Sequence, residues 1–193
     1  MREYLWQMSG NSFMSVDTNK HLTNLQNAIL RAFPDVVFDG QITPHDGEWP
    51  DDLPENAIYE GQVIYGDEML LYEGLNGHKW SDIPRQFIQG MATDFVLLTS
   101  EALVAFIAAW LMRSLENRTS KNEVREHFIY MLSPDREESN ELTIDLLRAF
   151  NPEQLAVLRL LFAEFSKSES SIFVRERAHN AVKFIDSLSI NPK

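Results

Sequence analysis

The sequence predicts an all-α fold, a single-domain bundle of about six or seven helices with one long acidic loop. Apolar residues recur at helical spacing along most of the chain, and capping residues and prolines mark where these stretches begin and end. The 193 residues are 44% apolar, which is enough for a sizeable core. We see no repeat and no internal domain boundary. We therefore expect one helical domain over residues 18–190, preceded by an N-terminal extension over residues 1–17 for which disorder is one alternative.

The first helix is expected to begin at residues 17–19, all of which are good N-caps, and to end at Pro34. Four apolar residues between them fall on one helical face: Leu22, Leu25, Ile29 and Phe33. Residues 34–55 are then predicted to be a long loop, because prolines and glycines interrupt every regular pattern there. A loop of this length usually has a function or is partly mobile.

Residues 56–75 carry two conflicting patterns. Several apolar residues share one helical face, yet the glycines and the run of residues 63–65 also suit a strand. We predict a helix, with residues 67–75 as its firm part, and the strand alternative stays open for residues 57–65.

The middle of the chain is expected to hold a short helix and then the central helix of the bundle. Pro84 suits the first position of a short helix that ends at Gln89. Thr99 is a good N-cap for the central helix, which we expect to run to about Asn117. Residues 102–112 are apolar on every face, so we expect other helices to surround them.

Four more helices are predicted in the C-terminal part, each with an apolar stripe. The first is expected over residues 122–132 and the second over residues 142–150. The third is expected to follow the Asn151 cap, with Pro152 in its first position, and the fourth is expected over residues 174–188.

The negative charge of the chain is concentrated in one stretch. The net charge is −12, and no Lys or Arg occurs between Arg31 and Lys79, where eleven acidic residues lie. An acidic surface repels phosphate backbones and attracts basic proteins. The sequence therefore predicts a basic protein as the partner and argues against a nucleic acid.

Composition also bears on the cellular location. The chain has no cysteine, so it forms no disulfide and no thiolate metal site, which is typical of a reducing compartment. The longest apolar run, over residues 102–112, is about half the length needed to span a bilayer, and no secretory signal is evident. We expect a cytoplasmic protein that does not enter the membrane.

The acidic loop contains the candidate partner-binding residues. Trp49 lies among carboxylates without apolar neighbours in sequence, as an exposed aromatic hot spot does. The alternative interpretation is a ring that folds back over the core. The candidate site consists of five residues: Asp46, Glu48, Trp49, Asp51 and Asp52.

No residue pattern predicts catalysis, a metal or a cofactor. His127 follows Glu123 by four residues and could share a metal with it, but a packed or capping histidine is the preferred interpretation. His45 and the loop acids lack the ordered spacing of a calcium loop. Neither a nucleophile elbow nor a glycine-rich phosphate loop occurs. Trp80 is expected to anchor a turn to the core.

Three stretches resemble an uncharacterised bacterial family, domain of unknown function 6714: residues 75–87 (LNGHKWSDIPRQF), 95–102 (FVLLTSEA) and 150–157 (FNPEQLAV). The resemblance covers residues 20–165. The chain departs from the family pattern at Ser100 and Ala108, where the family has proline. The resemblance implies an all-α fold, and it implies no activity and no catalytic residue.

Three functional hypotheses follow. The leading one is a cytosolic protein-binding module that uses an acidic face to bind a basic partner, with an antitoxin-like immunity protein as its specific form. The second is a small-molecule-binding protein or a hydrolytic enzyme with a pocket near Trp80. The third is a structural or oligomeric domain.

Overall fold

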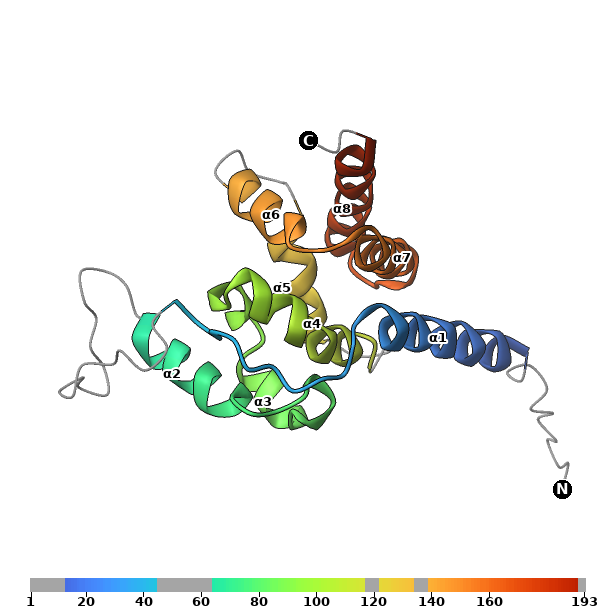
Figure 1. Cartoon of the computed structure of the whole chain (residues 1–193). Coiled ribbons are helices and arrows are strands. Elements are labelled where there is room, and N and C mark those ends of the chain that lie inside the picture. The colour runs from blue at the N-terminus through green and yellow to red at the C-terminus, as the bar shows by residue number, and fades with distance from the viewer. Residues whose placement is uncertain (1–12, 45–63, 117–121, 134–138, 191–193) are drawn as a thin grey trace, which may run out of the picture.

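The computed structural model describes residues 13–44, 64–116, 122–133 and 139–190, which contain eight α-helices and two 3-10 helices, η1 and η2, and no strand (Figure 1). The predicted all-α fold is confirmed. The α-helices are α1 (Phe13–Ala32), α2 (Ile64–Leu75), α3 (Arg85–Gly90), α4 (Ser100–Ser114), α5 (Glu123–Met131), α6 (Ser139–Arg148), α7 (Pro152–Ser168) and α8 (Ile172–Ile190). The 3-10 helices are η1 (Trp80–Asp82) and η2 (Asp94–Leu97).

Helix α4 lies in the middle of the molecule and contacts α1, α3, α5 and both 3-10 helices (Figure 1). Buried residues occur on all of its faces, as its apolar sequence predicts. The hydroxyl of Thr99 accepts the amide of Ala102, so the predicted N-cap is confirmed. The helix ends at Ser114, three residues before the predicted end, and the side chains of Asn122 and Arg125 donate hydrogen bonds to carbonyl groups at this end.

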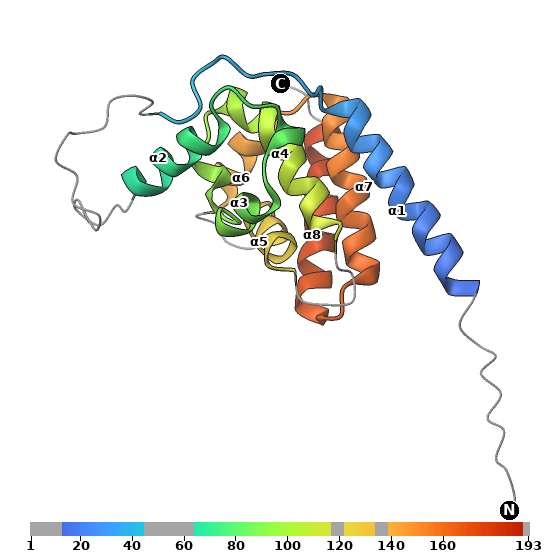
Figure 2. The same ribbon diagram turned by 90° about the horizontal axis from the view of Figure 1, so that it is seen from below.

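Helices α7 and α8 lie side by side as a hairpin (Figure 2). Asn151 and Gln154 form a reciprocal capping box at the start of α7, with Pro152 in the first turn as predicted. The Gln154 amide also donates to the carbonyl of Ala32 at 3.2 Å, which joins the start of α7 to the end of α1. Phe162 stacks on Phe128 of α5 with ring centroids 5.6 Å apart, so α7 also helps to bury α5.

Helices α1, α6 and α8 begin earlier than the sequence predicts. α1 begins at Phe13, so Asp17, Thr18 and Asn19 lie inside the helix and do not cap it. Such residues are tolerated within a helix at a small propensity cost, and a capping residue alone does not decide where a helix starts. α6 begins at Ser139, three residues before the expected start.

The predicted helix before residue 75 is confirmed for its described part. α2 starts at Ile64, so the strand alternative is wrong for residues 64 and 65, while residues 57–63 lie outside the described residues. The left-handed backbone of Gly77, with φ of 74°, follows the end of this helix.

Residues 33–44 form an extended strap that leaves the end of α1 and crosses the helices toward the start of α2 (Figure 2). Its first half is attached to η1. The Trp80 indole N–H donates to the carbonyl of Phe33 at 3.2 Å, and the ring is buried. Trp80 thus anchors this turn to the core, as predicted. The side chain of Asp35 accepts hydrogen bonds from the backbone amide and the hydroxyl of Ser81.

The second half of the strap is attached to the start of α4. The Thr99 hydroxyl donates to the carbonyl of Gln41 at 2.6 Å, and the Thr99 amide donates to the carbonyl of Ile42 at 2.9 Å. Phe38 meets Phe106 of α4 edge to face, with ring centroids 5.7 Å apart. The described part of the predicted loop is therefore held in place by hydrogen bonds and aromatic packing.

We expect Trp80→Phe to loosen the strap, because the variant leaves the Phe33 carbonyl without its indole donor and leaves a small void. The free energy of unfolding should fall by about 1–3 kcal/mol. Hydrogen exchange of residues 33–42 should quicken more than exchange in α7. Trp110→Phe is the matched control, since it removes the bond from that indole to the Met91 carbonyl, away from the strap. Equal acceleration of strap exchange in both variants would contradict the role of Trp80.

Candidate functional site

The five predicted partner-binding residues lie outside the described residues. They belong to the segment between the end of the strap at Pro44 and the start of α2 at Ile64. The strap and α2 therefore border this segment on both sides. The candidate site that the structure describes is built from these two elements.

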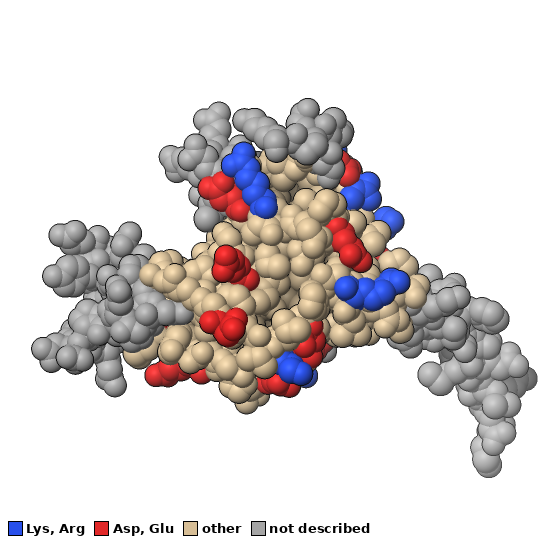
Figure 3. Space-filling view, in the orientation of Figure 1, with Lys and Arg blue, Asp and Glu red and all other residues tan. Residues whose placement is uncertain are grey.

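We define the acidic face as four carboxylates of the strap and α2 that are exposed or half-buried: Asp35, Asp39, Asp67 and Glu73. Figure 3 shows mostly acidic side chains over the strap, α2 and α3, whereas basic side chains stand mainly over α1, α6, α7 and α8. Because residues 32–78 contain no Lys or Arg, no cation from this stretch offsets the charge of the acidic face.

The acids of this region have different roles. Asp35 holds the strap to Ser81, whereas Glu68 of α2 is buried and does not belong to the exposed surface. Within the described part of the chain, Asp39 and Glu73 take part in no hydrogen bond or ion pair, and both are exposed. Asp39 and Glu73 are therefore the described acids most available to a partner.

Exposed apolar side chains accompany the acids of the strap. Val36 and Val37 are 59% and 52% exposed and lie between Asp35 and Asp39 in the chain. Leu70 of α2 is also largely exposed. Apolar side chains bordered by charged ones are typical of surfaces that bind other proteins.

Asp94 of η2 lies where α2 and α5 approach η2. Burial raises the pKa of its carboxyl group, and the charge of Asp67 raises it further. A hydrogen bond from Thr93 and the charge of His127 oppose this rise in pKa. The sequence alone did not identify Asp94, because helices that are distant in the chain bring its neighbours together.

His127 does not fit the preferred interpretation of a packed or capping histidine. Its side chain is exposed, as is that of Glu123. Among the residues that the structure describes, no three potential metal ligands of the His, Cys, Asp or Glu type lie close enough to hold an ion.

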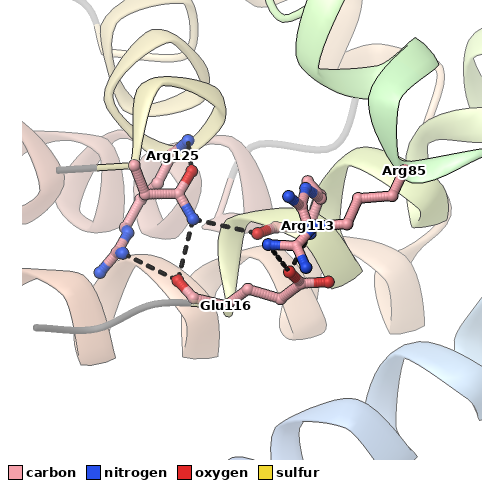
Figure 4. Close-up of polar contacts among 5 residues, drawn as sticks. Arg85, Arg113, Glu116 and Arg125 are labelled. Carbon is pink, nitrogen blue, oxygen red and sulfur yellow. Dashed lines mark hydrogen bonds and ion pairs between the residues drawn. The ribbon is translucent and has the colours of Figure 1, made fainter. Parts of the chain in front are cut away.

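A cluster of polar side chains closes the end of α4 (Figure 4). Arg125 is buried in α5; it donates to the Glu116 carbonyl at 3.1 Å and pairs with Glu169 at 2.6 Å. The Asn122 amide donates to the carbonyls of Arg113 and Glu116 at 3.1 and 2.9 Å. These bonds satisfy carbonyl groups that a helix end leaves without partners. No sequence pattern pointed to this cluster, since it unites α4, α5 and the end of α7.

A shallow depression of about 470 Å³ lies on α1. Asn24, Asn27, Leu30 and Arg31 line it, and they offer no group of converging titratable side chains. The buried indole of Trp80 is directed to the core, so it is not available to line a pocket at the surface. No described helix combines the length and the apolar character needed to cross a membrane.

Comparisons with known proteins returned no matching family model, no matching curated protein and no matching solved structure. The resemblance to domain of unknown function 6714 thus stays a prediction.

We expect Asp94→Asn to stabilise the protein at neutral pH. A raised pKa means that the folded state holds the Asp94 proton more tightly than the unfolded state, so wild-type stability falls as pH rises through that window. The stability of the variant does not fall in this way. Its free energy of unfolding at pH 7 should exceed that of the wild type by roughly 0.5 kcal/mol after solvent screening. Urea unfolding at pH 7 and pH 3.5 measures this difference. If the variant were more stable than the wild type by the same amount at both pH values, the raised pKa of Asp94 would not be the cause.

Proposed function

We propose that the chain is a cytoplasmic protein-binding module that uses its acidic face to bind a basic partner. The observation that carries this proposal is the strap. It presents Val36 and Val37 beside Asp39 in a segment whose ends are fixed by hydrogen bonds to η1 and α4. A surface that is ordered before binding loses less entropy on association, and its charge speeds the encounter with a basic protein.

The specific form of this proposal is an antitoxin-like immunity protein of a bacterial competition system. Acidic inhibitors of this kind meet basic toxins at rates raised by electrostatic steering. The candidate residues Asp46, Glu48, Trp49, Asp51 and Asp52 continue the same acidic segment in sequence and would enlarge the surface. This form predicts that the chain protects a cell from one basic toxin.

The proposal is tested with a double charge reversal, Asp39→Lys with Glu73→Lys, in the full chain. Both side chains are exposed and make no described polar contact, so the fold should be retained. Immobilised wild-type protein should capture a basic protein in stoichiometric amounts from the source organism at low salt. The double variant should bind that protein at least about tenfold more weakly, because two side chains that attract a basic partner are replaced by two that repel it. Isothermal titration with the purified partner measures the affinities.

The matched control is Glu153→Lys with Glu176→Lys, which changes the net charge equally but acts on exposed acids of α7 and α8. It should keep nearly full affinity if the acidic face is the site. Binding should also weaken about tenfold or more between 50 and 500 mM NaCl, because salt screens exposed charges. If both double variants lost the same affinity, or if binding did not depend on salt, the acidic face would not be the binding site.

A further inference from the structure

Two arginines from different elements converge on one carboxylate at the end of α4 (Figure 4). Arg85 of α3 reaches Oε2 of Glu116 at 3.0 Å, and Arg113 of α4 pairs with the same oxygen. Arg125 is paired with Glu169, so its charge is already balanced. Arg85 and Arg113 thus share the single negative charge of Glu116.

The three side chains differ in exposure. The Arg113 side chain is 6% exposed, whereas those of Arg85 and Glu116 are 55% and 40% exposed. A buried guanidinium needs a counter-charge, since an unpaired buried ion is costly. Burial lowers the pKa of Arg113, and the nearby charge of Arg85 lowers it further. The carboxylate that balances the Arg113 charge stands at the surface, where a solute can replace it.

We propose that Arg85 and Arg113 form a binding site for a phosphate group, and that Glu116 occupies the place of this anion in the free protein. Guanidinium groups bind phosphate oxygens through paired, charge-assisted hydrogen bonds. A phosphate with two negative charges neutralises both arginines, which the single charge of Glu116 does not. The Arg113 side chain is fixed by burial, and exposed Arg85 provides the accessible side of the site. This site is separate from the acidic face and does not depend on its function.

A purely structural ion pair makes the opposite prediction for Glu116→Gln. If Glu116 only closes the end of α4, the variant loses stability and gains no affinity for anions. If Glu116 stands in for a bound phosphate, the variant removes an internal competitor. Its affinity for phosphate should then rise by about tenfold, since a charge-assisted contact is released to the ligand. Whether the phosphate affinity of Glu116→Gln rises therefore distinguishes a stand-in for phosphate from a purely structural ion pair.

The experiment titrates the full chain with inorganic phosphate at pH 7.5 and constant ionic strength, and follows the arginine side-chain NMR signals. Wild-type protein should bind phosphate weakly and saturably, Glu116→Gln about tenfold more tightly, and Arg85→Met at least tenfold more weakly. Arg159→Met is the matched control, because Arg159 pairs with Asp186 on α7 and α8 instead. It should bind phosphate as the wild type does. Acetate should bind more weakly than phosphate, because it carries one charge.

Several results would overturn the proposal. These are an absence of saturable binding by the wild type, unchanged binding by Arg85→Met, tighter binding of acetate than of phosphate, and loss of phosphate affinity in Glu116→Gln. Arg113 is left intact in every variant, because removal of a buried side chain threatens the fold. If Glu116→Gln does not fold, the wild type and Arg85→Met decide the question, since Arg85 is exposed and its loss spares the core.

Discussion

The structure depends on the need to cover α4 on every side. Its apolar residues leave no face that water can solvate, and the hydrophobic effect therefore requires neighbours all around it. Contacts with α1, α3, α5 and the 3-10 helices provide most of this cover. The strap adds Phe38, whose ring meets Phe106 of α4 edge to face. A connection that is irregular in sequence thus becomes part of the core.

The strap connects the core to the surface that we assign to partner binding. Trp80 and Thr99 donate hydrogen bonds to carbonyl groups of the strap, while two of its valines are exposed. Backbone groups that would otherwise lack partners near the core are satisfied by side chains from η1 and α4. The same hydrogen bonds that stabilise the fold therefore set the position of the acidic face.

Charge is distributed so that the two proposed sites have opposite character. The acidic face collects carboxylates from a stretch without any Lys or Arg, and most basic side chains in this view lie over other helices (Figure 3). The end of α4, in contrast, holds three arginines and two glutamates in a partly buried cluster. Burial strengthens the electrostatic interactions of Arg113 and Arg125 there, whereas solvent screens the acidic face. An acidic protein can thus contain a local site for an anion.

The sequence by itself determined the helical fold, the caps at Thr99 and Asn151, and the anchoring role of Trp80, because periodicity, capping and indole burial act over short stretches. It also located the acidic stretch, although its five predicted partner residues lie outside the described part. Only the tertiary structure decided that Glu68 is buried, that His127 is exposed and that Arg85 and Arg113 pair with the same carboxylate of Glu116. These features depend on which helices pack together, and one-dimensional spacing holds no information about contacts between distant segments.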